Sequence, residues 1–320
     1  MCDLKPALTI QEQIDLLISR GMTIENCEEA SQVLGENNYY RFSGYAFLYQ
    51  KSNNHYRKGT SFELIVTLMS FDRELRSILM DTLEIIEVYA RTRIAHIFSM
   101  AHARNGGAYY DPSLFYNKDF HDEFLQDLEV QIQKNAQLPF VAHHINKFNG
   151  KMPLWCTVEI LPFSRLSKLY SNMLMDDKEL IAANMDTDAS HLTNWLHCFS
   201  VLRNACAHYS RLYQNTCSPS VSLDAPFFRK HRDVMGDSLF ACILAMFRIL
   251  PRDEWKTMLR DSLFRLAEKY PAVNLSGIGF PDDWKDIMLD NESISLRPVS
   301  PKRKLIKNIP PLPEGGSNES

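Results

Sequence analysis

The sequence predicts an all-α protein, a bundle of helices, and three observations support this prediction. Glycine accounts for only 12 of the 320 residues, about half of the usual ~7%. Glycine is absent from Lys151 to Met235, and proline is absent between Pro6 and Pro112 and between Pro162 and Pro219. Because these two residue types weaken helices most, such stretches favour helix formation. Finally, no segment of strand length alternates polar and apolar residues with a period of two.

The N-terminal residues 1–58 are expected to form a small helical unit. Thr9 and Glu12 match a capping box, in which two residues satisfy each other's backbone amides at the start of a helix. A second short helix is expected at about 24–34. The polar residues 51–60 are expected to form a loop.

The most regular pattern lies at 61–103, where apolar residues recur at three- and four-residue steps until Gly106 and Gly107 interrupt it. Further helices are expected at about 118–136, 156–175, 176–185, from 190 onward, 235–250, 252–269 and 282–289. We therefore predict a helical bundle over 59–250 and a helical C-terminal segment over 251–296.

The last residues, 297–320, differ from the rest in composition. They hold five basic and two acidic residues, together with five of the 15 prolines. Such a segment cannot build a hydrophobic core and is expected to stay disordered until it binds a partner. The alternative is a solvated tail without a specific role.

The overall composition narrows the class of protein. The net charge of −4 gives no global sign of a nucleic-acid-binding protein. The longest uncharged apolar run, Leu239–Phe247, is far shorter than the ~20 residues that cross a bilayer. Seven cysteines without a C-x-x-C pair fit a reducing compartment, and the N-terminus has no signal-peptide pattern. We expect a cytoplasmic protein without a membrane partner.

Charge is nevertheless unevenly distributed along the chain. Residues 197–232 contain five arginines and lysines, whereas Asp224 is the only acidic residue there. A basic segment within an acidic protein indicates a local site for an anion.

Several common chemistries have no motif in this chain. It lacks phosphate-binding and dinucleotide-binding glycine loops, the zinc-protease motif and the nucleophile elbow. His143 and His144 have no cluster of cysteines or carboxylates beside them, as a metal site would require. No metal and no cofactor are therefore expected.

The strongest local feature is V-L-R-N-A-C-A-H-Y-S-R-L at 201–212. On a regular helix, Asn204, His208 and Arg211 share one face, whereas Arg203 lies about 140° away from His208. One interpretation is a polar helix face that neighbouring carboxylates satisfy. The other is a catalytic site, because histidine exchanges a proton near neutral pH and arginine offers two fixed donors to phosphate. Such a pair suits cleavage of RNA by its own 2′-hydroxyl without a metal.

R-N-A-C-A-H at 203–208 resembles the R-x₄₋₆-H signature of the HEPN superfamily, whose members are often metal-independent endoribonucleases. Within it, the chain resembles the bacterial Abi-like family (abortive infection, AbiD/AbiF type). The stretches that carry this resemblance occur in order between residues 20 and 290: R-G-M-T-I (20–24), N-Y-Y-R-F-S-G-Y (38–45), F-E-L-I-V-T-L-M-S-F-D-R-E-L-R (62–76), I-E-V-Y-A-R-T-R-I (86–94), P-L-W-C-T-V-E-I (153–160), L-R-N-A-C-A-H-Y-S-R-L (202–212) and G-F-P-D-D-W (279–284).

Two positions depart from the family pattern. Pro162-Phe163-Ser164 stands where the family often has Ser-Phe-Gly, and Gln214 stands where an asparagine is expected. Neither departure touches the R-x₄-H motif.

The resemblance implies a HEPN-type helical bundle in which Arg203 and His208 are catalytic and Asn204 orients them. It also implies a homodimer, in which two such motifs share one cleft. Family members act as toxins or abortive-infection factors in phage defence, and some resemble toxins that a small non-coding RNA inhibits. RNA is therefore the expected partner, as substrate and as a possible antitoxin.

Other residues are candidates for phosphate or RNA binding. Arg211 is expected to hold phosphate beside Arg203. Glu87 and Arg91 are four residues apart on the long helix, where Arg91 lines an RNA cleft or the two form a simple ion pair.

Near the N-terminus, Tyr40 and Arg41 combine aromatic and basic groups, as RNA-stacking surfaces do. The alternative is that the tyrosines of 38–41 pack the N-terminal unit onto the bundle. Asp72 and Arg76 are expected to belong to a solvated or salt-bridged helix face.

These observations lead to the hypothesis of a toxin-like endoribonuclease in a bacterial anti-phage system. Its products would carry 2′,3′-cyclic phosphates and 5′-hydroxyls, and EDTA would not stop it. A non-catalytic HEPN-like module that holds a structured non-coding RNA is the alternative. A purely structural helical adaptor, with no affinity for RNA, is the third possibility.

Overall fold

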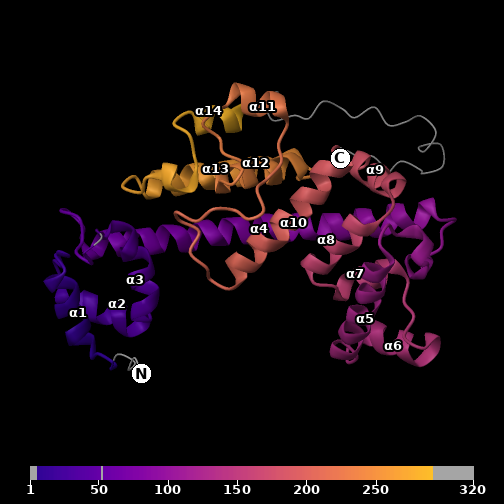
Figure 1. The fold of residues 1–320 in the computed structure, drawn as a ribbon, viewed down its shortest axis with the longest axis horizontal. Coiled ribbons are helices and arrows are strands. Elements are labelled where there is room, and N and C mark those ends of the chain that lie inside the picture. Colours follow the sequence, from indigo (N-terminus) through magenta and orange to yellow (C-terminus); the bar gives the residue numbers. More distant parts are fainter. Residues whose placement is uncertain (1–5, 52, 291–320) are drawn as a thin grey trace, which may run out of the picture.

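The computed structural model describes residues 6–51 and 53–290. This part of the chain consists of α-helices and short 3₁₀ helices without a strand, so the predicted all-α fold is confirmed. The molecule is elongated, and the helix α4 (Phe62–Ala101) runs along most of its length (Figure 1). The other elements are arranged around this helix.

The sequence explains why α4 is long and why it is central. Ser61 caps its first turn, since the Ser61 hydroxyl accepts a hydrogen bond from the Leu64 amide. The apolar residues of the predicted 61–103 pattern are buried along its whole length, for example Ile65, Leu79 and Ile94. The helix contacts α3 at one end, α7 and α9 toward the other, and α10, α12 and α13 between them.

The N-terminal unit contains α1 (Ile10–Ser19), α2 (Cys27–Glu36), α3 (Tyr39–Ala46) and the 3₁₀ helix η1 (Phe47–Tyr49). The capping box at the start of α1 is confirmed. The Thr9 hydroxyl accepts from the Glu12 amide, and the Glu12 carboxylate accepts from the Thr9 amide at 2.7 Å. Because α3 packs directly on α4, this unit is joined to the first turns of the long helix.

The far end of α4 carries the next helices. They are the 3₁₀ helices η2 (Ala108–Tyr110) and η3 (Pro112–Leu114), and then α5 (Lys118–Lys134), α6 (Pro139–Phe148), α7 (Leu154–Ile160), α8 (Phe163–Asn172) and α9 (Met175–Ala183). The expected single helix at 156–175 was wrong. Pro162 separates α7 from α8, because its ring cannot continue a helix, and it stands at the N-cap of α8. The helix α6 was not predicted, although Pro139 occupies its first turn, where proline is tolerated.

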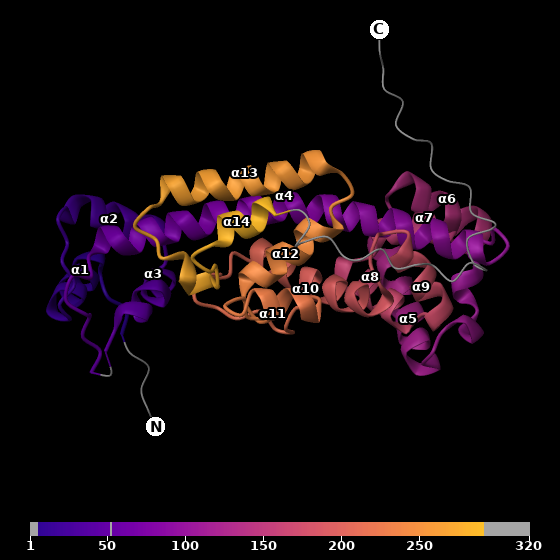
Figure 2. The same cartoon turned by 90° about the horizontal axis from the view of Figure 1, so that it is seen from above.

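The C-terminal half supplies the remaining helices. They are α10 (Ala189–Ala207), α11 (Ala225–Lys230), α12 (Leu239–Ile249), α13 (Asp253–Lys269), the 3₁₀ helix η4 (Leu275–Ile278) and α14 (Trp284–Leu289). Of these, α10, α12 and α13 pack against α4. Figure 2 shows α13 lying along α4, with α10 and α12 beside it. The apolar run predicted at 239–247 forms α12, which is almost completely buried.

One hydrophobic core runs from Ile14 in α1 to Met288 in α14. The predicted boundaries at 58 and 250 fall in the connections before α4 and after α12. The predicted tail at 297–320 lies outside the described residues. Among the described helices, none is long and apolar enough to cross a membrane.

Candidate functional site

The R-x₄-H motif lies at the C-terminal end of α10. The helix ends at Ala207, and His208 is its C-cap. Tyr209 then adopts a left-handed backbone conformation with φ of 57°, which is uncommon for a residue other than glycine. The amides of Tyr209 and Ser210 donate back to the carbonyls of Cys206 and Ala205, a Schellman arrangement that closes the helix. His208 is therefore displayed at a fixed helix end, and its side chain is exposed.

The helix end corrects one expectation about this motif. Arg211 does not share a helix face with Asn204 and His208, because α10 has already ended. Instead, the Arg211 guanidinium donates a hydrogen bond to the carbonyl of Gly44 in α3. Arg211 thus joins the N-terminal unit to the segment that follows the motif. Asn204 remains on the exposed surface of α10.

Arg203 contacts an acidic residue of α4. Its Nε lies 3.7 Å from Glu87 Oε2, and its side chain remains 42% exposed. Glu87 also accepts a hydrogen bond from Arg91 at 2.5 Å, while Arg91 donates to the Leu161 carbonyl at 2.9 Å. The expected ion pair between Glu87 and Arg91 is therefore present. In addition, Glu87 links this pair to the motif, so that one buried carboxylate lies between two arginines of different helices.

The segment after the motif is held by charged side chains from α3 and α4. Arg41 donates to the Tyr209 carbonyl at 2.9 Å, and Arg76 donates to the Ser210 carbonyl at 3.1 Å. The carboxylate of Asp72 accepts hydrogen bonds from the amides of both Leu212 and Tyr213 at 3.0 Å. These contacts join three parts of the chain that are distant in sequence.

Asp72 is the centre of this network and is fully buried. Besides the two amides, it accepts from the Tyr45 hydroxyl at 2.7 Å and pairs with Arg76 at 2.5 Å. Burial, together with the charge of Asp72, raises the pKa of Tyr45 to about 12, so the phenol keeps the proton that it donates. Of the two expectations for Asp72 and Arg76, the salt bridge is present, whereas a solvated face is not. Both are buried because α3 and the 210–213 segment cover them.

The candidate stacking residues of α3 differ in their exposure to solvent. Tyr40 is 85% exposed, whereas Tyr39 is partly buried against the core. The Arg41 guanidinium donates a hydrogen bond to the Tyr209 carbonyl. Arg41 is thus a structural contact in this structure, and Tyr40 is the member of the motif that is open to a ligand.

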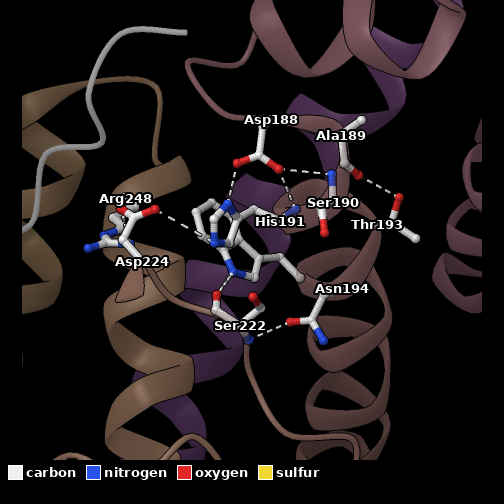
Figure 3. A network of polar contacts seen from close by, with 10 residues as sticks. Asp188, Ala189, Ser190, His191, Thr193, Asn194, Ser222, Asp224 and Arg248 are labelled. Carbon is white, nitrogen blue, oxygen red and sulfur yellow. Dashed lines mark hydrogen bonds and ion pairs between the residues drawn. The ribbon is translucent and has the colours of Figure 1, made fainter. Parts of the chain in front are cut away.

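The other end of α10 is anchored by a second polar network, which Figure 3 shows. Asp188 is the N-cap of α10, and its carboxylate accepts from the amides of Ser190 and His191 at 2.9 Å and contacts the His191 ring. His191 Nε2 lies 3.8 Å from Asp224 Oδ1, and the buried Arg248 pairs with Asp224 at 3.3 Å.

The contacts of this network lower the pKa of Asp188. Burial alone would raise the pKa of Asp188. Hydrogen bonds from the amide and the ring of His191, the charge of His191 and the hydrogen bond from the Ser190 amide together outweigh burial, so the pKa of Asp188 is lowered. Asp224, the only acidic residue of the basic segment, is thereby engaged with His191 and Arg248.

A large groove, with a volume of about 1130 Å³, lies beside the Glu87–Arg91 pair. Arg91 lines it, together with residues of α7, the turn before α10 and the turn between α12 and α13. Trp155 is 52% exposed on its wall, and Arg252 lies 5.2 Å from the centre of the Trp255 ring. Gly106 lies directly beneath Trp155, and a Cβ there would lie 2.6 Å from the indole. This close approach explains why glycine follows α4.

The groove carries both signs of charge. Its arginines and acidic residues are Arg91, Arg93, Arg104, Arg252, Glu84, Glu159 and Asp186. Within the described residues, no group of three or more histidines, cysteines or carboxylates has the arrangement of a metal site.

Comparison with known proteins identifies the family. The family model for Abi-like proteins matches residues 32–214, which include the N-Y-Y-R motif, all of α4 and the R-x₄-H motif. The chain belongs to the Abi-like protein family. The family resemblance predicted from the sequence is thus confirmed, and membership indicates a role in abortive infection. No curated protein and no solved structure matches the chain.

Several stretches that resemble the Abi-like family lie close together in the fold. These stretches contact α10 or the segment after it. Arg41 and Gly44 come from 38–45, Asp72 and Arg76 from 62–76, and Glu87 from 86–94. Gln214, which departs from the family pattern, has a left-handed φ of 50°, a conformation that asparagine adopts more readily.

Sequence reasoning missed two groups of residues. The burial of Asp72 and Arg76 and their contact with Tyr45 were missed because only the fold reveals them, although all three residues lie inside the quoted motifs. The groove residues Trp155 and Trp255 were missed because they are separated by 100 positions, and no periodic pattern joins them.

Replacement of Asp72 by asparagine is expected to destabilise the protein strongly. D72N leaves Arg76 buried without its counter-charge, and the amide cannot accept all of the present donors. Loss of one partner of a buried ion pair costs about 3–5 kcal/mol of the free energy of unfolding. Urea unfolding measures this loss. The matched control is D81N, on an exposed position of the same helix, and equal stability of D72N and D81N would contradict the assigned role.

Replacement of Asp188 by alanine is expected to reduce stability in a pH-dependent manner. Because folding lowers the pKa of Asp188, its contribution is present above the unfolded value of about 3.9 and is lost as the pH falls through the lower folded value. At pH 7, D188A should lose about 1 kcal/mol, the usual contribution of an N-cap. Thermal unfolding from pH 7 to pH 2.5 should show the stability difference between D188A and wild type becoming smaller in acid. A difference that stays constant would show that the charge of Asp188 does not contribute to stability.

Proposed function

We propose that this Abi-like protein is a metal-independent endoribonuclease toxin of a bacterial abortive-infection system. The observation that supports it most directly is the end of α10. There Arg203 and His208 are both accessible, and Arg41 of α3 and the buried Asp72 of α4 hold the adjoining backbone. A rigid helix end with an exposed arginine and histidine suits general acid–base chemistry at a phosphodiester.

The proposed reaction uses the RNA as its own nucleophile. The 2′-oxygen attacks the adjacent phosphorus, the bond from phosphorus to the 5′-oxygen breaks, and the proton of the 2′-hydroxyl is removed while the 5′-oxygen gains one. His208 would transfer these protons. Arg203, which is held by Glu87 at only one of its nitrogens, would use its remaining donors on the phosphate. The products are a 2′,3′-cyclic phosphate and a 5′-hydroxyl.

Within one chain, Arg203 and His208 are held apart. Five residues of helix correspond to about 7.5 Å along the axis and about 140° around it. Two copies of the chain that bring their α10 ends together could place Arg203 of one copy beside His208 of the other. We therefore propose a homodimer as the active form, with Asn204, which is exposed on the same helix end, orienting the two groups.

RNA would continue from this site into the groove beside Arg91. Exposed indole rings offer stacking surfaces to unpaired bases, and arginines contact the phosphates. Trp155, Trp255 and Arg252 provide both kinds of contact. Tyr40, highly exposed on α3, is a further stacking candidate.

The alternative is a non-catalytic module that holds a structured non-coding RNA. The groove supports this alternative, because its aromatic and arginine side chains would bind RNA whether or not cleavage occurs. In a toxin, the same surface would receive an inhibitory antitoxin RNA.

Substitution of His208 by alanine separates the two functions. H208A should reduce the rate of cleavage at least about 100-fold, as expected for loss of a general acid–base group. Its affinity for RNA should stay within about three-fold of wild type. The measurement is sequencing of 5′-hydroxyl RNA ends after expression of each variant, with binding measured on the purified protein.

The matched control is H197A, which removes another exposed histidine of α10. Its RNA ends should equal those of wild type. Undiminished cleavage by H208A would refute the role of His208. An absence of 5′-hydroxyl ends even in wild type, with intact RNA binding, would favour the non-catalytic module.

Substitution of Trp155 by alanine tests the groove. Loss of one stacking surface should weaken binding of single-stranded RNA by about 1–3 kcal/mol, or roughly 5- to 150-fold. Fluorescence anisotropy with a labelled oligonucleotide measures it at a stated salt concentration. Y116A, which removes an 86% exposed aromatic residue outside the groove, should bind like wild type. Equal affinities of W155A and Y116A would exclude the groove as the RNA path.

A further inference from the structure

Tyr209 follows His208 directly and occupies the position at which α10 is closed. Helices end most often on glycine at this position, and less often on asparagine, because both accept a left-handed backbone. Tyr209 has this backbone, with φ of 57°. For a tyrosine, the left-handed conformation costs free energy that glycine would not lose. The requirements of the helix end therefore do not explain why a tyrosine stands here.

The side chain of Tyr209 has no structural task that would explain it either. Tyr209 is 68% exposed. Within residues 6–51 and 53–290, its hydroxyl has no hydrogen-bond partner and its ring stacks on no other ring. A large aromatic side chain that packs against nothing adds little to the stability of a fold. The identity of this residue thus calls for a ligand.

In contrast to the side chain, the backbone at Tyr209 is held from several sides. The Tyr209 amide donates to the Cys206 carbonyl at 3.1 Å, and the Tyr209 carbonyl accepts from Arg41 of α3 at 2.9 Å. The next carbonyl, that of Ser210, accepts from the buried Arg76 at 3.1 Å. Strained residues persist where such contacts determine them, and they cluster at functional sites. The result is an exposed ring with only two rotatable bonds on a fixed backbone.

We propose that Tyr209 is a specificity-determining residue, whose ring stacks on an unpaired RNA base next to the phosphate on which His208 acts. This inference rests on the proposed endoribonuclease function and deepens it, because it names the substrate as single-stranded RNA. An aromatic ring on a fixed backbone binds a base at a small cost in conformational entropy. Purines have the larger ring system and stack more strongly, so we expect cleavage beside a purine.

The first measurement compares the bases that flank the 5′-hydroxyl RNA ends formed by wild type, Y209F and Y209N. Asparagine accepts the left-handed backbone but has no ring, whereas phenylalanine keeps the ring. Wild type and Y209F should share a purine preference on one side of the cut, and Y209N should lose it. The control Y116N removes a tyrosine that is 86% exposed at the other end of α4 and should cleave like wild type. Identical flanking bases for wild type and Y209N would overturn the proposal.

The second measurement distinguishes failure of this proposal from failure of the proposed reaction. It compares the binding of a labelled, adenine-rich single-stranded RNA to H208A and to the double variant H208A/Y209N, which both leave the RNA uncut. Loss of one stacking contact should weaken binding roughly 5- to 150-fold. Equal affinities of the two variants would overturn the role of Tyr209. If wild type forms no 5′-hydroxyl ends while Y209N still weakens binding, the proposed reaction fails and the stacking role stands.

Two properties of Y209N exclude structural roles for the ring. Because asparagine accepts the left-handed backbone, Y209N should unfold at the same urea concentration as wild type or at a higher one, and a lower midpoint would assign Tyr209 to support of the fold. Light scattering should give wild type and Y209N the same mass. A Y209N monomer beside a wild-type dimer would assign the ring to a contact between copies and would overturn the proposal.

Discussion

The buried carboxylate of Asp72 imposes the strongest constraint on this structure. A charge without solvent is tolerated only when hydrogen-bond donors surround it, and here the donors come from Tyr45, Arg76 and two backbone amides after α10. Satisfying this one group therefore fixes α3, α4 and the 210–213 segment relative to one another. The position of His208 follows, because its helix end leads directly into the anchored segment.

A second carboxylate, Glu87, sets the position of Arg203. Glu87 belongs to α4 and pairs with Arg91 of the same helix and with Arg203, which lies about one turn before the end of α10. Arg91 in turn contacts the connection between α7 and α8 and lines the groove. The candidate site and the groove thus share a chain of charged contacts, which explains why several separate sequence motifs of the Abi-like family meet at one place.

Local features of the fold could be predicted from the sequence, whereas features that depend on distant contacts could not. The Thr9–Glu12 capping box and the periodic pattern of α4 need only neighbouring residues, and both were correct. The break at Pro162 was missed because apolar residues continue on both sides of it. The burial of Asp72 and the bond from Arg211 to Gly44 depend on chain segments more than 130 residues away. The R-x₄-H motif itself could be recognised in the sequence, but the residues that hold it in place could not.

The length of α4 has a consequence for the order in which the protein is assembled during translation. Its apolar surface is complete once Ala101 has been synthesised, yet α13, which covers part of that surface, ends roughly 170 residues later. At ~5–20 residues per second, that surface waits roughly 10 to 30 s for its cover. Over this interval a nascent chain of this kind presents a long apolar stripe to the cell, and it depends on chaperones or on its own early helices to stay free of aggregation.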